Sequence, residues 1–240
     1  WQVQIDQLAL GRSEKDATLP TLSFEVNGRS AHGRMAQAPL GAVAQVARWL
    51  NPSFDAAQVA LTGTAKDIEF DWDATQLVGR RLRMSTTVQR ASIASRSESF
   101  ALHGLNARIT GNERTIDLDL ESQNARVEFR DALDEPIKDL RLASRIRLQT
   151  NPDGWKLTTS KLTLESDAAR LTVSGSMTSD PARGVPAIDL RGTMPKADIE
   201  KLQKTFGTTL ARAFGANAGR LSAGRIENAR FDLKSTLDAA

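Results

Sequence analysis

The sequence contains no cysteine and only two histidines among its 240 residues. Without cysteine the chain has no disulfide framework and no thiol chemistry. The histidines, His32 and His103, lie far apart and each precedes a glycine, whereas a zinc site needs more ligands at closer spacing. These absences favour two incidental histidines over a metal centre, and we expect the protein to use no metal and no cofactor.

Long apolar runs and blocks of like charge are absent too. No window approaches the ~18 consecutive apolar residues of a membrane-spanning helix. The net charge is +3, and acidic residues are interspersed with basic ones, which argues against a nucleic-acid partner. Residues 1–240 are expected to form a single unit. Because the chain starts inside an alternating run and ends in "FDLKSTLDAA", we expect a segment of a longer protein.

What the sequence does contain is alternation of apolar and polar residues. "TIDLDLES" places Ile116, Leu118 and Leu120 on one face of a strand, and similar runs recur along the chain. Turn residues separate many of them, including "NG" at residues 27–28 and "NPDG" at residues 151–154. Short strands joined by such turns predict an antiparallel sheet in which consecutive strands pair.

Nearly every predicted strand has one face of charged or hydroxyl side chains, whereas a strand buried on both faces would be apolar throughout. The sheet should therefore have one apolar and one solvated side. Phase slips, such as the one between Leu157 and Leu162, and in-strand glycines predict β-bulges and strong coiling. From the residues alone, the apolar side either closes on a core of side chains or curls around something else.

Two segments have helical spacing and are expected as helices at about residues 39–51 and 196–214. In the first, Pro39 suits the initial turn and "NP" at residues 51–52 ends it. In the second, Pro195 is expected to end the preceding strand, since proline lacks the N–H of a ladder hydrogen bond. The apolar stripe of the second helix consists of Ile199, Leu202, Phe206, Leu210 and Phe214. It could pack on the sheet, which is the more frequent case, or lie at a membrane surface.

Motifs that carry catalysis are missing. There is no G-x-S-x-G elbow for a nucleophilic serine and no glycine-rich loop for phosphate. Asp71 and Asp73 have a spacing of about 7 Å on a strand, within the range of glycosidase carboxylates, and Trp72 between them could serve as a sugar platform. Because the same face is charged on most strands, a solvated surface is the preferred interpretation. We expect no enzymatic activity.

The sequence resembles the AsmA-like family of Gram-negative bacteria, particularly its large YhdP-type members. The resemblance lies in "WQVQIDQLAL" (residues 1–10), residues 102–129, "WKLTTSKLTLESDAARLTVSGSM" (residues 155–177) and "AIDLRGTMPKADIEKL" (residues 187–202). It covers most of the chain, and "FGTTLARAFGANAG" after residue 205 departs from the family pattern. The resemblance implies a mainly β fold: an elongated, strongly bent antiparallel sheet forming an open, taco-like apolar groove with two short helices.

The resemblance also implies a function. Members of the family look like bridge-like, inner-membrane-anchored periplasmic carriers that pass phospholipid between the inner and outer membranes, without a cofactor. The residues expected to line the groove are Leu22, Phe24, Val26, Ile116, Leu118, Leu120, Val127, Phe129, Leu171, Val173, Ile188 and Leu190. The helix bearing Ile199, Leu202, Phe206 and Leu210 is expected to cap the groove. Two alternatives remain: an outer-membrane assembly module with a closed β core and no lipid, and a carbohydrate-binding or hydrolytic β protein using Trp72 with Asp71 and Asp73.

Overall fold

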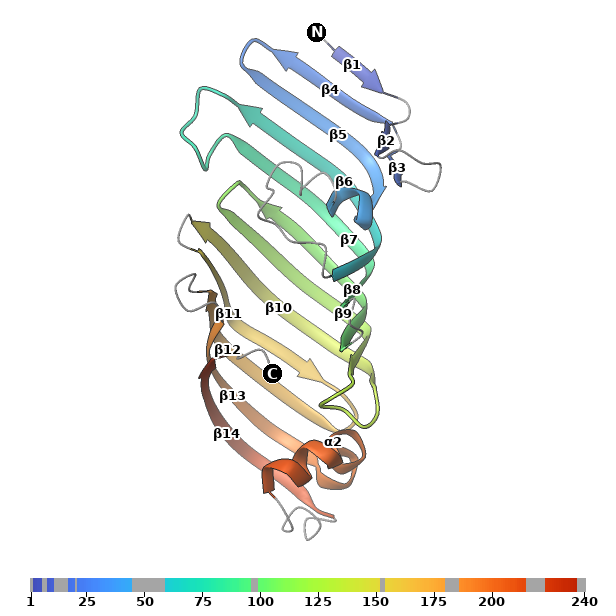
Figure 1. Cartoon of the computed structure of the whole chain (residues 1–240), viewed down its shortest axis with the longest axis vertical. Coiled ribbons are helices and arrows are strands. Elements are labelled where there is room, and N and C mark those ends of the chain that lie inside the picture. Colours follow the sequence, from blue (N-terminus) through green and yellow to red (C-terminus); the bar gives the residue numbers. More distant parts are fainter. Residues whose placement is uncertain are drawn as a thin grey trace.

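The computed structural model describes residues 2–5, 8–10, 17–19, 21–44, 59–95, 99–151, 154–179, 186–214 and 223–236. The described strands form one 12-stranded sheet and one separate pair (Figure 1). In sheet order the twelve are β1 (Gln2–Ile5), β4 (Leu22–Asn27), β5 (Ser30–Pro39), β6 (Val59–Asp73), β7 (Leu82–Ser95), β8 (Phe100–Gly111), β9 (Thr115–Phe129), β10 (Ile137–Asn151), β11 (Gly154–Glu165), β12 (Ala169–Ser179), β13 (Pro186–Asp198) and β14 (Arg225–Thr236). The pair is β2 (Leu8–Leu10) with β3 (Ala17–Leu19).

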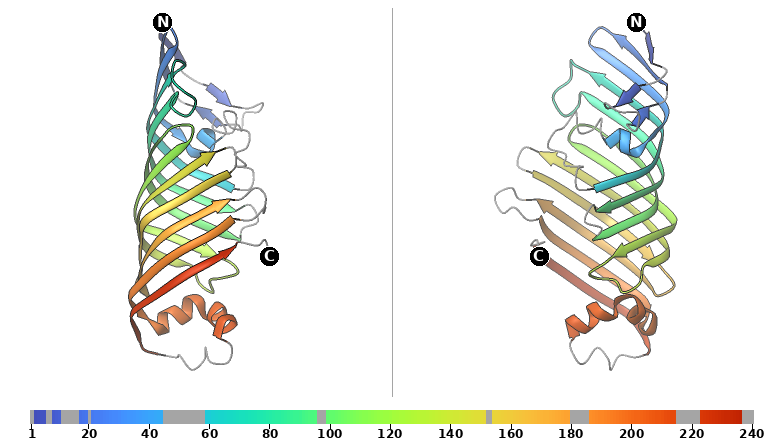
Figure 2. Two further views of the ribbon diagram at one scale, coloured as in Figure 1. Left: turned by 90° about the vertical axis from the view of Figure 1, so that its left-hand side faces the viewer. Right: turned by 45° about the vertical axis from the view of Figure 1, so that its right-hand side comes forward.

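Every pairing in the large sheet is antiparallel, and from β4 onward each strand pairs with the next one in the chain. β1 and β14 are the two ends of the sheet order, so the sheet formed by the described residues is open and not a barrel. Figure 2 shows that it is elongated and bent about its long axis. The predicted mainly β fold, with a bent antiparallel sheet and two short helices, is confirmed.

The connections differ between the two long rims of the sheet. One rim, called the short-turn rim, carries the turns β4–β5, β6–β7 and β8–β9, and no described helix lies in these turns. The opposite rim, called the helix rim, carries a helical segment at residues 40–44 after β5, the β9–β10 loop, and α2 (Ile199–Phe214) after β13. Both helices lie on the concave side of the bend (Figure 2).

Irregular strand pairing accounts for the bend. The register shifts in seven consecutive strand pairs, from β6–β7 to β12–β13. Asp67, Arg90 and Asp139 adopt left-handed backbone conformations, with φ of 51°, 49° and 52°. Such bulges bend a strand and increase its twist. The bulge predicted between Leu157 and Leu162 is confirmed by a register shift there.

The helix boundaries correct two predictions. Pro195 does not end its strand: β13 continues to Asp198 and α2 begins at Ile199 rather than at residue 196. Proline is tolerated inside β13 because the register with β12 shifts beside it, so the missing N–H falls where the ladder is interrupted. Similarly, Pro39 is the last residue of β5. The first helix is described at residues 40–44, and the rest of its predicted span lies outside the described residues.

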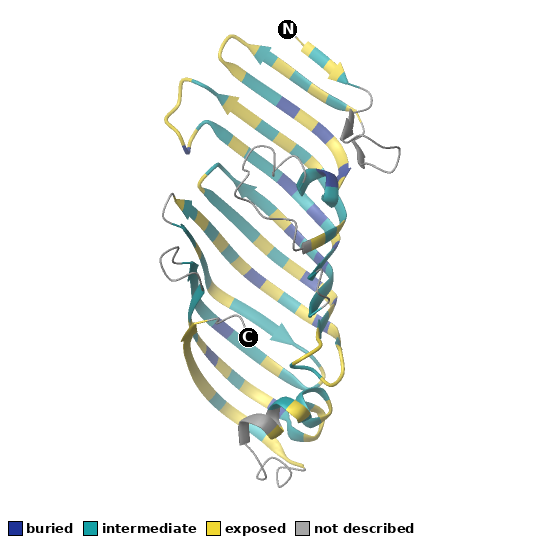
Figure 3. Ribbon diagram, in the orientation of Figure 1, coloured by how far each residue is buried: buried dark blue, intermediate teal, exposed yellow. Residues whose placement is uncertain are grey.

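Buried side chains gather toward the helix rim (Figure 3). One cluster consists of Val88, Ala91, Leu105, Ala107, Ala125 and Leu140, and Leu40 of the first helix packs against it. A second cluster joins Met35 and Ala38 of β5 to Ala42 of that helix. The first helix therefore covers the apolar face of β5 to β8, which identifies this face as the concave one.

Candidate functional site

The apolar side chains of the sheet line up from strand to strand. In an antiparallel sheet, directly paired residues place their side chains on the same face. Following the pairs from β1 to β14 gives an unbroken line across all twelve strands, called the Phe24 row: Val3, Phe24, Gly33, Phe70, Met84, Gly111, Ile116, Leu148, Leu157, Met177, Ile188 and Ser235. No member of this row is charged.

Two further rows run beside it, closer to the helix rim. The Leu22 row consists of Ile5, Leu22, Met35, Ile68, Thr86, Ile109, Leu118, Ile146, Thr159, Gly175, Leu190 and Leu233, with one register shift between Ile68 and Thr86. The Leu120 row consists of Ala38, Ala65, Val88, Ala107, Leu120, Ser144, Leu162, Val173, Gly192 and Phe231. These rows also contain no charged residue, so the concave face is an uncharged strip along the whole sheet.

The structure brings the predicted lining residues together on this face. Eight of them belong to the three rows: Phe24, Ile116, Ile188, Leu22, Leu118, Leu190, Leu120 and Val173. Val26 lies nearer the short-turn rim, in a line with Ala31, Trp72 and Leu82 that we call the Trp72 row. Leu171 pairs with Leu164, and Val127 packs against the first buried cluster. Phe129, at the helix rim, is 43% exposed and stacks on Phe100 with ring centroids 5.8 Å apart.

The few hydroxyl groups on the concave face bond to the protein itself. Thr86 Oγ1 donates to the Lys66 carbonyl at 2.9 Å, and Ser122 Oγ accepts from the Asn106 N–H at 2.8 Å. Ser144 and Thr159 bond to each other at 3.0 Å. Since buried polar groups are costly unless they are paired, this pairing lets the face carry hydroxyls without offering them to a ligand.

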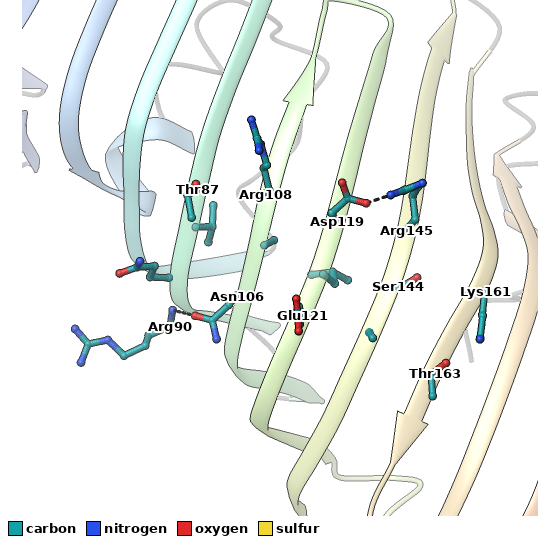
Figure 4. A pocket seen from close by; sticks show the side chains of 15 residues that line it. Thr87, Arg90, Asn106, Arg108, Asp119, Glu121, Ser144, Arg145, Lys161 and Thr163 are labelled. Atoms are coloured by element: carbon teal, nitrogen blue, oxygen red, sulfur yellow. Dashed lines mark hydrogen bonds and ion pairs between the residues drawn. The ribbon is translucent and has the colours of Figure 1, made fainter.

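The convex face is charged, in contrast to the uncharged strip on the concave face. Cross-strand ion pairs link Arg147 to Asp117 at 2.6 Å and Arg145 to Asp119 at 2.7 Å, and the hydrogen bonds within these pairs raise the pKa of both arginines. A depression of about 840 Å³ lies on this face around Arg108, Asp119, Arg145 and Lys161 (Figure 4). It is open and mixed in charge, so it does not extend the apolar strip.

The residues around Trp72 do not form the carbohydrate site that was considered as an alternative. Trp72 pairs with Ala31 on the concave face, whereas Asp71 and Asp73, one residue to either side, point to the convex face. Asp71 Oδ1 lies 2.6 Å from His32 Nδ1. Hydrogen bonds from the Thr75 hydroxyl and N–H hold the pKa of Asp73 below its usual range, the opposite of what a general acid requires.

Helix α2 is fastened along the helix rim by contacts to two connections. The Asp134 N–H donates to the Thr205 carbonyl and the Thr208 N–H donates to Asp134 Oδ2, both at 2.8 Å. In its first turn Lys201 Nζ lies 2.9 Å from Asp167 Oδ2, and this hydrogen bond raises the pKa of Lys201. Ile199, Leu202 and Phe206 are half-buried, while the side chain of Leu210 lies outside the described ones.

Sequence reasoning missed several members of the rows. Phe70 and Met84 lie at alternating positions in "IEFDW" and "LRM", so periodicity alone could have found them. The glycine–phenylalanine pairs Gly33–Phe70 and Gly192–Phe231 could not be found this way. Each depends on which residues of two strands face one another, and one strand's sequence does not contain that information.

Within the described residues, no three His, Asp or Glu side chains gather closely enough to hold a metal ion. None of the helices described is long and apolar enough to cross a bilayer. A family model described as YhdP protein matches residues 1–239 of the chain. No curated protein and no solved structure gives a significant match.

Proposed function

The chain belongs to the YhdP family, and from this premise we propose that it is a segment of a bridge-like lipid transfer protein. In this proposal the concave face shields the acyl chains of phospholipids as they pass between the inner and outer membranes. The protein would act in the periplasm of a Gram-negative bacterium, anchored to the inner membrane through a segment outside this sequence. Its partners would be phospholipid and the two membranes, and the transfer needs no catalysis.

The observation that carries the proposal is the uncharged strip of three rows, which runs across the sheet from β1 to β14. Moving an acyl chain of ~16 carbons into water costs on the order of 12 kcal/mol, at ~0.8 kcal/mol per CH₂ group. A chain that lies against the strip exchanges one apolar environment for another. Because each strand contributes a similar set of apolar side chains, the free energy of the bound chain stays nearly constant along the sheet.

The paired hydroxyls support the same function. A polar group left free on the concave face would bind water or a headgroup and would hold the lipid at one position. Thr86, Ser122, Ser144 and Thr159 all bond within the protein. The face is therefore suited to passage rather than to tight binding at one site.

Helix α2 is proposed to cover the helix rim near β11 to β13. Its half-buried Leu202 and Phe206 lie on a helix that is fixed to the β9–β10 loop and to the β11–β12 turn. A helix fastened at its first turn and near its middle shields one side of the strip from solvent and leaves the short-turn rim as the side by which a lipid enters.

Native mass spectrometry of the purified chain tests the proposed function. We expect adducts with the masses of phospholipids, which organic extraction removes and thin-layer chromatography identifies. A chain that is folded by circular dichroism but free of phospholipid, even after incubation with vesicles, would count against the proposal.

The open sheet argues against the alternative of an assembly module with a closed β core. The described strands form an open sheet with β1 and β14 at opposite ends. Large apolar side chains also stay accessible on the concave face, since Phe231 and Leu233 of β14 are 37% and 45% exposed.

A further inference from the structure

Burial on the concave face changes along β6 and β7. On β6, Trp72 beside the short-turn rim is 39% exposed, while Ala65, seven residues on toward the helix rim, is fully buried. On β7, Leu82 and Met84 are half-buried and Val88 is 4% exposed. At these two strands the face therefore opens toward the short-turn rim and is covered toward the helix rim (Figure 3).

The strand length from Trp72 to Ala65 exceeds the thickness of the hydrocarbon in one leaflet of a membrane. Seven residues of extended strand, from Trp72 to Ala65, span about 23 Å at ~3.3 Å per residue. The hydrocarbon of one leaflet is about 15 Å thick, half of a bilayer core. An acyl chain that starts at the short-turn rim can thus lie along the strands and end among the buried rows.

Tryptophans stand at the boundary. Trp72 belongs to the row nearest the short-turn rim, and Trp155 pairs with Thr150 near the same rim, on β10 and β11. Tryptophan concentrates where hydrocarbon meets the polar layer of a membrane, because its ring is apolar and its N–H is polar. The short-turn rim has this character at Trp72 and at Trp155.

Cations lie in the short turns near Trp72. Arg80 and Arg114 belong to the β6–β7 and β8–β9 turns, and neither forms an ion pair with a described residue. Arg29, in the β4–β5 turn, is close enough to Asp73 to help lower the pKa of that carboxyl. The nearby acids bond mainly to the backbone and to their own turn: Asp73 accepts bonds from Thr75, and Glu113 Oε1 accepts the Leu82 N–H at 3.1 Å, while Glu113 Oε2 is buried without a hydrogen-bond partner. The side chain of Arg114 packs over Gly79, which brings the β6–β7 and β8–β9 turns together.

At the helix rim Lys201 bonds to Asp167, and Arg225 lies directly opposite Asp198 in the β13–β14 pair. Free guanidinium groups bind phosphate well, since their planar donors match its oxygens. Arg80 and Arg114 at the short-turn rim are therefore the candidate contacts for a lipid phosphate.

We propose that the short-turn rim is the headgroup side of the trough, by which we mean the concave face with its three apolar rows. The phosphodiester of a phospholipid binds at Arg80 and Arg114, near Trp72, and the acyl chains point along the strands toward the helix rim. This orientation rests on the proposed function, and it adds a binding site for the phosphate and a direction for the lipid.

Quenching of tryptophan fluorescence by brominated phosphatidylcholine tests the orientation. A protein that retains only Trp72, with the other three tryptophans changed to phenylalanine, is loaded with lipid brominated either near the acyl carboxyl end or near the methyl end. We expect the carboxyl-end bromines to quench Trp72 at least twofold more strongly. In a protein whose single tryptophan is Leu120→Trp, on the deeper row, the order should reverse.

The outcomes separate the two proposals. Equal or reversed quenching orders overturn the orientation while leaving lipid binding intact, whereas no quenching by either lipid overturns the proposed function. If Leu120→Trp fails to fold, a nitroxide on Thr150→Cys replaces it. The chain has no other cysteine, and this label on the short-turn rim should broaden the NMR signals of the lipid headgroup more than those of the terminal methyl groups.

Charge reversal tests the phosphate site. Arg80→Glu with Arg114→Glu should weaken loading from phosphatidylglycerol vesicles about fivefold per arginine, while Lys161→Glu with Arg230→Glu on the convex face should not. Unchanged loading in the first variant overturns the arginine site. Protection of the turn amides by inorganic phosphate alone would mean that free phosphate suffices as the ligand, and this would overturn the assignment to a lipid headgroup.

Discussion

The sharpest test of the trough is a single charge placed in its middle. Leu118 is half-buried in the Leu22 row between Ile109 and Ile146. In Leu118→Asp without lipid, the carboxylate can reach water across the open trough, so the folded state loses only about 1–2 kcal/mol of leucine burial. This is small against a typical stability of about 5–15 kcal/mol, and the sheet should remain folded.

With lipid in place the same carboxylate would lie against acyl chains. An aspartate in hydrocarbon costs about 2.5–3.5 kcal/mol on the membrane-insertion scale, which corresponds to a loss of lipid affinity on the order of 100-fold. We expect native mass spectra of Leu118→Asp to show little or no phospholipid, with an unchanged circular dichroism spectrum and a modest fall in the urea midpoint.

Thr158→Asp is the matched control, because Thr158 lies on the convex face between Arg147 and Ser176. It adds the same charge to the same sheet and should leave lipid loading unchanged. Val173 is a poorer test position: it is only 7% exposed, so an aspartate there would be buried without a partner and should prevent folding. A folded Leu118→Asp protein that carries as much phospholipid as the wild type would refute the reasoning.

Three further predictions concern the fold around the trough. Gly175→Ala should lower the free energy of unfolding by about 3 kcal/mol in urea titrations, since its φ of 143° and a backbone overlap both oppose a side chain, whereas Gly28→Ala, at an open turn, should cost about 1 kcal/mol. Asp134→Ala should speed amide exchange in α2, because it removes the carboxylate that accepts the Thr208 N–H, one of that helix's bonds to the β9–β10 loop, while Glu135→Ala should not. The folded pKa of Asp73 is lowered, so its contribution to stability is present above the ordinary value of 3.8 and disappears as the pH falls through the lower folded value; NMR titration of its carboxyl carbon should show this low midpoint.

The apolar face could be predicted from sequence because its period is two. "TIDLDL" assigns Ile116, Leu118 and Leu120 to one side of a strand whatever that strand pairs with, and the same holds for Leu22, Phe24 and Val26. These local patterns, together with short turns, fixed the order of strands in an antiparallel sheet. The pairings of the structure agree with this order.

Two features could not be predicted from the periodicity of the sequence: whether a strand ends at a proline, and which turns lie side by side at the short-turn rim. Pro195 lacks a ladder donor in any context, but whether it ends a strand depends on the register with β12, which is set by contacts distant in sequence. Likewise, the free guanidinium groups of Arg80 and Arg114 became visible only once the β6–β7 and β8–β9 turns were placed side by side. Periodicity describes one strand at a time, and both features involve two.

Glycine in the concave wall bears on how the strip keeps an even surface. A glycine inside a strand leaves a gap and weakens the sheet, and a gap in the wall would hold a chain end or a water molecule. At Gly33 the ring of Phe70 from the next strand lies over the glycine backbone, and at Gly192 the ring of Phe231 does the same. A large side chain on one strand thus covers the gap on its neighbour, as aromatic residues do for glycines in other sheets. Filled gaps and internally paired hydroxyls have the same consequence, because both remove the places where a passing lipid would be held. The even surface of the concave face is therefore produced by particular residues of the sequence and is more than the lack of a binding site.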